Sequence, residues 1–347
     1  MRWYGWTRWG RLFLVVVGGL LTGPVVSQAA TTNAVGFTVK AQLPKNQADQ
    51  RHSFFDLNMA VGQQQTLKAM ISNITNRDIK VRMGINTAYT NGSGIIEYLT
   101  PAKSLDPSLK VAVSKVTKLT GPKTVTVPAN GSKTVSAQVQ LPNQELNGTL
   151  LGGWYFKWLN EKVTGSVKGS TNITNEYAYV IGLKYRLGHE PTPNLKLGAV
   201  QAGLVNYHRG ILIDLRNPTA TVISGLTTDT TIKNRATGEV LKHVSKSQVK
   251  MAPNTLYRAP ILTGSQRLRA GQYHLHLAAH NQAHRWIFDR DFEITDQAVK
   301  KYNRTAVDNR GISIWWLVGL GALAMLVFVM IIVWIFLMVR KRHRYAD

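Results

Sequence analysis

The residues best suited to chemistry in this sequence are four histidines near its C-terminal end: His274, His276, His280 and His284. The first two alternate along a predicted strand, so their side chains share one face of it. A zinc site needs three or four ligands that converge on the ion, and the His-Glu-x-x-His pattern is absent from the sequence. We therefore expect solvated strand and turn histidines, no metal site, and charges that change between about pH 5 and 8.

Three acidic residues, Asp289, Asp291 and Glu293, share one face of the next predicted strand. Paired carboxylates carry out glycoside hydrolysis, but a row of three on a terminal strand is more typical of a solvated acidic stripe. The sequence has no cysteine, which excludes thiol catalysis. It also contains no Gly-x-Ser-x-Gly motif, phosphate loop or dinucleotide fingerprint. We therefore predict a protein that is not an enzyme and requires no cofactor.

A polar loop in the first half of the chain is the better candidate for binding. Asparagine and glycine tolerate positive φ, so the run from Thr90 to Gly94 predicts a turn at the end of a sandwich. The simplest interpretation is a tight loop selected for its geometry. The alternative is a polar ledge that contacts a glycan or a peptide. The candidate ligand-binding residues of this region are Thr90, Asn91, Gly92, Ser93, Glu97 and Tyr98.

An aromatic strand supplies two further candidates. Because side chains alternate along a strand, Trp154, Phe156 and Trp158 share one face, whereas Tyr155 and Lys157 share the other. Aromatic faces stack on sugars, but three aromatic residues in a row are more often part of a sandwich core. In that case Tyr155 and Lys157 form the exposed pair, and both are candidate ligand contacts.

The elements that position these residues are predicted to be strands throughout. Short segments with period-two alternation, such as Ile79–Asn86, recur between turn signals at about ten-residue spacing, which indicates an all-β, immunoglobulin-like antiparallel sandwich. The pattern breaks at His189–Asn194, where two prolines stiffen a polar linker. We predict one β-sandwich domain at 31–188 and a second at 189–296.

The two ends of the chain suggest export and anchoring. Residues 314–339 are free of charge, long enough to span a bilayer of about 30 Å, and followed by the basic segment 340–347, which predicts a cytoplasmic tail. Residues 1–30 combine a basic start, a short apolar stretch and small residues, as in a secretory signal peptide. An uncleaved N-terminal anchor is the alternative. The polar segment 297–313 is expected to be a short stalk, either helical or extended.

The net charge is +24, and it is spread over both predicted domains. A positive field attracts polyanions. For an exported protein these are anionic wall polymers or host matrix, whereas nucleic acid is not expected as a partner. A basic composition that only serves solubility is the simplest alternative.

Several stretches, in order along the chain, resemble the WxL-interacting protein family of Gram-positive bacteria. They are Gly36–Phe37, Phe55–Leu57, Ala88–Tyr98, Leu151–Trp154, Asn175–Tyr179, Leu215–Pro218 and Gly271–Tyr273. The resemblance implies a single-pass type I membrane protein with most of the chain outside the cell. It further implies an N-terminal peptidoglycan-binding domain and a second, host-binding domain, with the family's own boundary near 160–168.

The resemblance also suggests partners: peptidoglycan for the first domain, and WxL-domain surface proteins or host extracellular matrix proteins for the second. Two alternatives remain open. One is an assembly factor or adhesin that binds only protein. The other is a hydrolase of wall glycans, for which Glu97 would be the residue to test.

Overall fold

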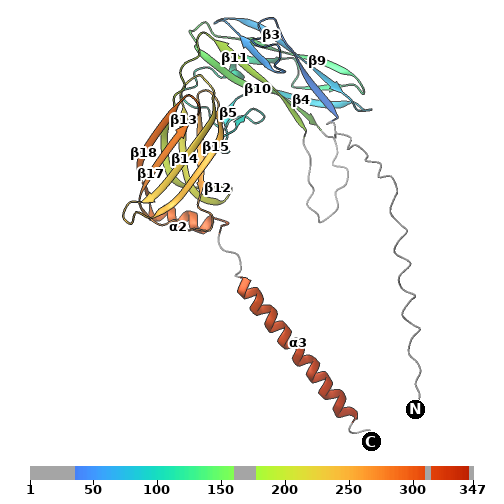
Figure 1. The fold of residues 1–347 in the computed structure, drawn as a ribbon. Coiled ribbons are helices and arrows are strands. Elements are labelled where there is room, and N and C mark those ends of the chain that lie inside the picture. Colours follow the sequence, from blue (N-terminus) through green and yellow to red (C-terminus); the bar gives the residue numbers. More distant parts are fainter. Residues whose placement is uncertain (1–35, 160–176, 309–313, 344–347) are drawn as a thin grey trace, which may run out of the picture.

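The computed structural model describes residues 36–159, 177–308 and 314–343. These residues form two β-sandwiches, a short helix on the second sandwich and a long C-terminal helix (Figure 1). The expected all-β class, with sandwiches of mostly antiparallel strands and one apolar C-terminal helix, is confirmed. The predicted signal peptide at 1–30 lies outside the described residues.

The first sandwich consists of two sheets. The four-stranded sheet has the order β1 (Phe37–Gln42), β3 (Gln64–Asn73), β9 (Ser132–Gln140), β7 (Thr117–Thr120). The five-stranded sheet has the order β2 (Phe55–Asn58), β11 (Ala178–Leu187), β10 (Gly148–Leu159), β4 (Ile79–Thr87), β8 (Thr124–Val127). Neighbouring strands are antiparallel except β2 and β11, which are parallel. A single short helical turn, α1 (Val113–Val116), precedes β7.

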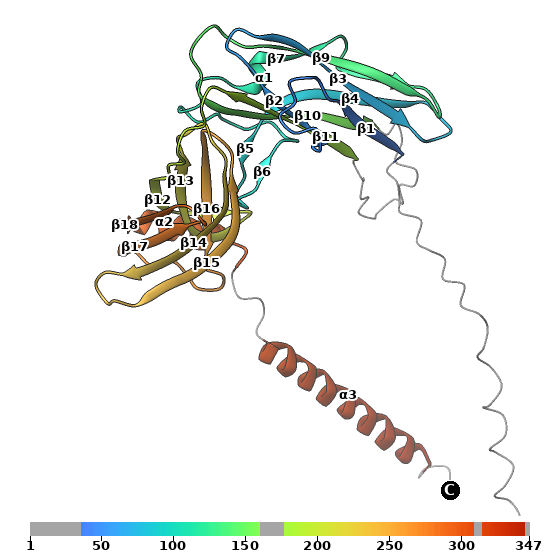
Figure 2. The same cartoon turned by 45° about the horizontal axis from the view of Figure 1, so that its top comes forward.

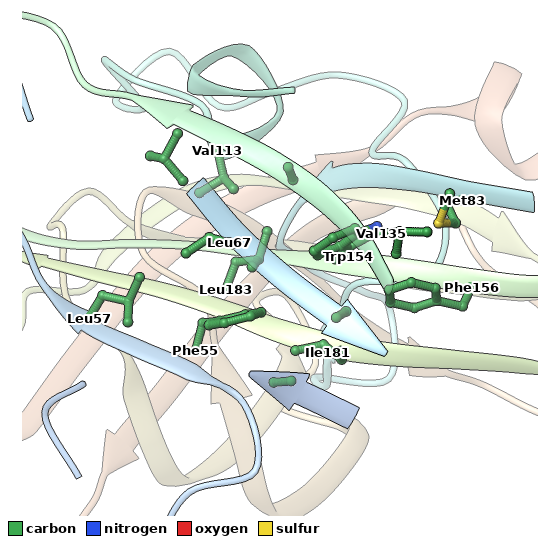
Figure 3. Close-up of a cluster of buried hydrophobic side chains, with 14 of the residues drawn as sticks. Phe55, Leu57, Leu67, Met83, Val113, Val135, Trp154, Phe156, Ile181 and Leu183 are labelled. Atoms are coloured by element: carbon green, nitrogen blue, oxygen red, sulfur yellow. The ribbon is translucent and has the colours of Figure 1, made fainter. Parts of the chain in front are cut away.

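The core of this sandwich explains the aromatic strand. Trp154 and Phe156 on β10 are fully buried between the sheets, and their rings lie 5.1 Å apart (Figure 3). Trp158 at the end of the same row is partly buried against the core. The predicted core face is therefore confirmed, and alternation places the intervening residues on the outer face of the five-stranded sheet.

Strand β11 belongs to the first sandwich. It pairs with β10 from Gly148↔Leu187 to Lys157↔Ala178, and its inward-facing Leu183 and Tyr185 lie in the first core. The chain between β10 and β11 includes the undescribed segment 160–176. The second sandwich begins only after the proline-containing linker.

The second sandwich also has two sheets. One has the order β12 (Lys196–Val205), β13 (His208–Asn217), β16 (Thr255–Leu262). The other has the order β15 (Val240–Met251), β14 (Ile223–Asn234), β17 (Gly271–His280), β18 (Arg285–Ile294). Their inner faces form a separate core with Ile213, Leu215 and Leu275 at its centre. Each domain therefore has its own hydrophobic core.

The expected stalk at 297–313 requires a correction. Helix α2 (Asp296–Thr305) begins at Thr295, whose hydroxyl accepts a bond from the Ala298 N–H at 3.2 Å. Val299 and Tyr302 pack against the second core. The apolar side of this polar helix thus covers the sandwich. Residues 309–313 of the predicted stalk lie outside the described residues.

A small hairpin joins the two sandwiches. Strands β5 (Tyr89–Thr90) and β6 (Ile96–Glu97) leave the first domain and reach the β15–β16 end of the second (Figure 2). The Lys250 N–H donates to the Gly94 carbonyl at 2.8 Å. Arg216 donates to Asp106, which is almost completely buried, at 2.9 Å. The junction is thus made of specific polar bonds as well as the linker.

The last element, α3 (Ile314–His343), contacts neither sandwich (Figure 1). Its segment Trp316–Ile335 has a mean hydropathy of 2.8 and buries no surface within the protein. A long helix whose apolar side chains find no protein to cover them needs an apolar solvent, which a bilayer provides. Its length and composition are those of a membrane anchor.

Candidate functional site

A groove of about 1050 Å³ lies in the first sandwich, between β1 and β11. Consecutive residues of both strands line it, 39–43 and 179–184, together with the loop 50–54. Because side chains alternate across a strand, a run of consecutive residues lines a groove only where the edge of the strand faces it. The groove is therefore an open seam between the two sheets of the sandwich.

Among the described residues, no strand pairs with the facing edges of β1 and β11 along this seam. The Trp158 N–H bonds the Tyr177 carbonyl, so alternate residues along β11, including Tyr179 and Ile181, direct their backbone groups toward β10. By the same alternation, the backbone N–H and C=O of Val180 point away from β10. They open into the groove because β2 pairs with β11 only from Leu183 onward. On the opposite side, β1 pairs with β3 and with no other strand in the part of the chain that the structure describes.

The open part of the β11 edge is short. At one end, the Phe37 ring meets the Tyr179 ring edge-on at 5.0 Å, which brings the two sheets together. At the other end, the pairing of Phe55 in β2 with Leu183 begins, and the side chain of Phe54 lies beside Gly182. The free edge is thus bounded at both ends.

The lining of the groove is basic. Among the described residues that line it are Lys40, Arg51, His52 and Lys184, and none is an aspartate or a glutamate. The His52 ring stacks on Phe54, with centroids 4.7 Å apart. This combination of cations and a flat aromatic pair suits a ligand with both anionic groups and apolar surface.

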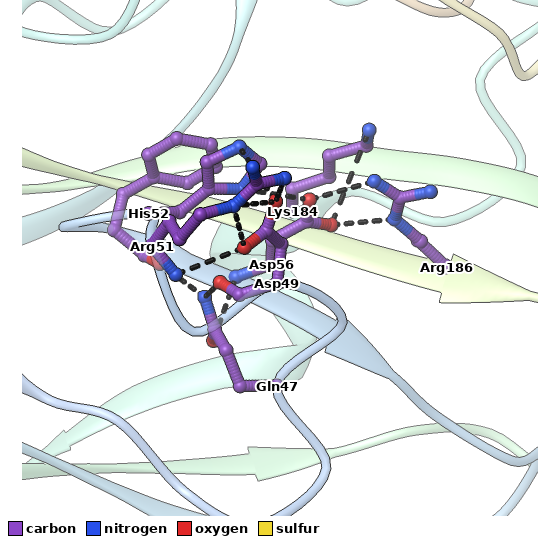
Figure 4. A network of polar contacts seen from close by, with 8 residues as sticks. Gln47, Asp49, Arg51, His52, Asp56, Lys184 and Arg186 are labelled. Carbon is purple, nitrogen blue, oxygen red and sulfur yellow. Dashed lines mark hydrogen bonds and ion pairs between the residues drawn. The ribbon is translucent and has the colours of Figure 1, made fainter.

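A buried carboxylate beneath the rim lies close to two of these cations, His52 and Lys184 (Figure 4). Asp56 is inaccessible to solvent and accepts two bonds from Arg186, at 2.6 and 2.7 Å. His52 Nδ1 lies 3.3 Å and Lys184 Nζ 4.0 Å from the same carboxylate. Burial alone would raise the pKa of Asp56, but the Arg186 bonds and the nearby Lys184 charge outweigh it and hold the pKa below its usual value.

The same network orders the loop that forms the wall of the groove. The Asp56 N–H donates to Gln47 Oε1 at 3.1 Å, and Gln47 Nε2 donates to the Phe54 carbonyl at 2.9 Å. Asp49 accepts the Arg51 guanidinium at 2.7 Å, which together with the Arg51 N–H lowers the pKa of Asp49 to about 2. The loop therefore presents its cations from a defined backbone.

Two paired glycines flatten the sheet beside the groove. Gly153 and Gly182 are cross-strand neighbours on the outer face of the five-stranded sheet. A Cβ on Gly153 would lie 2.8 Å from both the Tyr98 Cβ and the Val180 Cγ1, so neither side chain could stay where it is. Tyr98 therefore lies directly on the glycine, and burial raises its pKa.

The structure separates the predicted polar loop from this groove. The Thr90 hydroxyl is buried at the domain junction, where it accepts the Ala252 N–H at 3.0 Å and lies 2.8 Å from Thr255 Oγ1. Asn91 Oδ1 accepts the N–H groups of Ser93 and Ile95 and closes the turn. Gly92 and Ser93 are exposed beside the second domain.

Glu97 has a local role in the structure. Its carboxylate accepts the backbone N–H groups of Tyr98 and Leu99 at 3.0 and 2.8 Å, respectively. It thereby holds Tyr98 at the turn where that residue meets the groove. Of the six loop residues proposed from sequence, Tyr98 lines the groove.

Tyr155 and Lys157 lie on the outer face of the five-stranded sheet, which Tyr98 also contacts. Tyr155 is paired with Val180 across the β10–β11 ladder, and its ring covers Gly84 in β4. It also lines a smaller hollow of about 400 Å³ between β4 and β7, with Lys118 on its rim. The structure thus brings three of the eight proposed residues to one face.

The groove cations were not identified from the sequence. Lys40, Arg51 and Lys184 lie on three separate segments, and no motif connects them. The one local signal is His52 two residues before Phe54, a spacing that places two rings on one side of an extended segment.

The histidines of the second domain form an exposed ladder with aspartates. His274 lies opposite Asp291, and His276 opposite Asp289, with Nδ1–Oδ1 distances of 2.7 Å in both pairs. The bond to Asp291 raises the pKa of His274, while the bond from His276 lowers that of Asp289. No group of three or more ligands suited to a metal ion occurs in the described parts of the chain.

Comparison with known families matches residues 37–158 to the peptidoglycan binding domain of WxL Interacting Protein. Residues 168–304 match its host binding domain. The second match begins before β11, which packs in the first sandwich. No curated protein sequence matches the chain.

Comparison with solved structures finds weak similarity to two chaperones. The YadV chaperone is 12% identical over 75% of this chain and 100% of its own, with a TM-score of 0.30. The CupB2 chaperone of Pseudomonas aeruginosa is 13% identical over 67% and 96%, with a TM-score of 0.27. A family 123 glycoside hydrolase from Clostridium perfringens is 7% identical over 44% and 27%, with a TM-score of 0.28. Scores this low do not bear on function.

Proposed function

Because this chain belongs to the WxL-interacting protein family, we propose that it is a non-catalytic surface protein whose first domain binds peptidoglycan in the β1–β11 groove. The observation that supports this site is the groove itself: it is large and open at the surface, and its described lining contains cations but no carboxylate. Tyr98 and the stacked pair of His52 and Phe54 add apolar surface for sugar or peptide groups.

Helix α3 would hold the two sandwiches outside the membrane, with the basic residues after 339 on the cytoplasmic side. Anchoring confines the first domain to the vicinity of the wall, so that a weak site is occupied through its effective concentration. The second domain would then bind a protein, either a WxL-domain surface protein or a host matrix protein. Its outer sheet face, with Ile287 half exposed between charged neighbours, is the surface that we assign to this contact.

The test is sedimentation of the detergent-solubilised full chain with purified wall sacculi. We expect the protein to pellet with the sacculi, and the double variant Lys40→Gln with Arg51→Gln to pellet much less. The matched control is Lys196→Gln with Lys300→Gln, which removes the same charge from exposed positions of the second domain. Equal losses in both double variants would mean that general charge attraction, and not the groove, carries the binding.

A further inference from the structure

We infer that the groove recognises the stem peptide of peptidoglycan, bound as a short extra strand on the free edge of β11. The inference rests on the proposed function and specifies which part of the polymer is bound. Val180 would pair with the peptide backbone, while Lys40, Arg51 and Lys184 would bind its carboxylates. The glycan strand would lie outside, toward Tyr98.

The first step of the argument is the direction of the backbone groups. The Met59 N–H bonds the Arg186 carbonyl, so Arg186 faces β2. Residues an even number of positions away face the same side, and among these Val180 lies before the stretch that β2 covers. Its N–H and C=O therefore open into the groove. A free strand edge of this kind is a template for an extended peptide.

The second step is the length of the free edge. The Phe37–Tyr179 contact closes the seam at one end, and the pairing of Phe55 with Leu183 occupies the edge at the other. A strand from a folded protein, typically five or six residues long, would collide with one of these ends. A peptide of a few residues fits between them, which favours the stem peptide over a protein strand.

The third step is charge. Stem peptides carry free carboxylates, whereas the N-acetylated sugars of the strand are neutral. The lining offers Lys40, Arg51 and Lys184 and no acidic side chain among the described residues. Two carboxylates lie near this group outside the lining: Asp49 accepts bonds from Arg51, and Asp56 accepts two bonds from Arg186. The four cations Lys40, Arg51, Lys184 and Arg186 therefore exceed these two carboxylates, and the region keeps a net positive charge for an anionic peptide.

The first experiment compares intact sacculi with glycan strands from which an amidase has removed the stem peptides. Cleavage leaves the lactyl carboxylate on each muramic acid, so the negative charge of the polymer does not disappear with the peptide. We expect the full chain in detergent to pellet with intact sacculi and to lose most of this binding to stripped strands, recovered by ultracentrifugation. Equal binding to both would overturn the stem-peptide inference and leave the proposed function standing. Binding to neither would overturn both.

The second experiment removes the backbone donor. Val180→Pro deletes an N–H that faces away from β10, and proline is tolerated at such edges. Val180→Ala keeps the N–H and is the matched control. Loss of one hydrogen bond of about 1.4 kcal/mol corresponds to about tenfold weaker binding of a soluble muropeptide. We expect that loss in Val180→Pro and nearly unchanged binding in Val180→Ala.

A third measurement uses the unmodified protein, so its outcome does not depend on whether the proline variant folds. In the unmodified protein, the Val180 amide should exchange its hydrogen more slowly once a soluble muropeptide is bound. An unchanged exchange rate at saturating muropeptide would overturn strand pairing, whatever the variants do.

Discussion

The two domains place histidine beside aspartate in opposite surroundings. In the first, Asp56 is buried, with His52 and Arg186 packed around it at the groove. In the second, His274 and His276 bond to Asp289 and Asp291 on an open sheet face, where each side chain is about half exposed. Burial fixes the geometry of the first set, whereas water screens the charges of the second set.

The largest expected effect is the loss of stability when the central carboxylate of the first set is removed, compared with removal of a carboxylate from the second set. Asp56→Ala leaves Arg186 without its two bonds in a partly buried position, so we expect the free energy of unfolding to fall by about 2–3 kcal/mol. Asp289→Ala, the matched control, removes an exposed carboxylate whose ion pairs are screened by water and should have a much smaller effect. Urea denaturation of the purified full chain measures both. A comparable loss in the two variants would remove the contrast between the two sets.

The next prediction concerns the junction between the regions. Thr90→Val keeps the shape of a buried side chain but deletes the hydroxyl that bonds Ala252 and Thr255 across the domains. We expect a loss of about 1–2 kcal/mol and a broader range of interdomain angles in small-angle scattering. Ser93→Ala, exposed in the same loop, is the control. Unchanged scattering in Thr90→Val would show that the Thr90 hydroxyl does not set the arrangement of the domains.

The two sets should also respond to pH in opposite directions. The pKa of Asp56 is below its unfolded value of about 3.9, so its contribution to stability is present above that value and is lost as pH falls through the folded pKa. The pKa of His274 is raised, so its contribution is complete below about 6.5 and is lost as pH rises through the folded pKa. Unfolding of the wild type, Asp56→Ala and His274→Gln across both windows tests this. If His274→Gln left the neutral pH dependence unchanged, the ladder would contribute no linkage.

The smallest effect is a local one within the ladder. The Asp291 bond is the main cause of the raised pKa of His274. Asp291→Asn should therefore lower that pKa toward about 6.5 without unfolding the sheet, as read from imidazole resonances in an NMR titration. A pKa that stays raised in this variant would assign the shift to Asp289 instead.

Much of the fold could be predicted because its signals are local. Period-two alternation located the strands, and the row of Trp154, Phe156 and Trp158 identified a core face by spacing alone. The apolar run beyond 314 needed only its length. Helix α2 was missed as a packed element, although Ala298, Val299 and Tyr302 carry a helical apolar spacing.

The candidate site could not be predicted in the same way, because it depends on pairings between distant segments. Asp56 and Arg186 are 130 residues apart, and Thr90 and Thr255 are 165 apart. Whether a strand edge stays free depends on which strands pair. Strand β2 pairs in parallel with β11, although the two are far apart in the sequence. A polar loop such as Thr90–Gly94 has the same sequence whether it meets a ligand or another domain.

The most direct test of the central claim is amide hydrogen exchange of the full chain in detergent, with and without soluble peptidoglycan fragments. The account predicts protection in the three groove segments 39–43, 50–54 and 179–184, and unchanged exchange in β17 and β18 of the second domain. Protection confined to β17 and β18, with the groove segments unchanged, would contradict it.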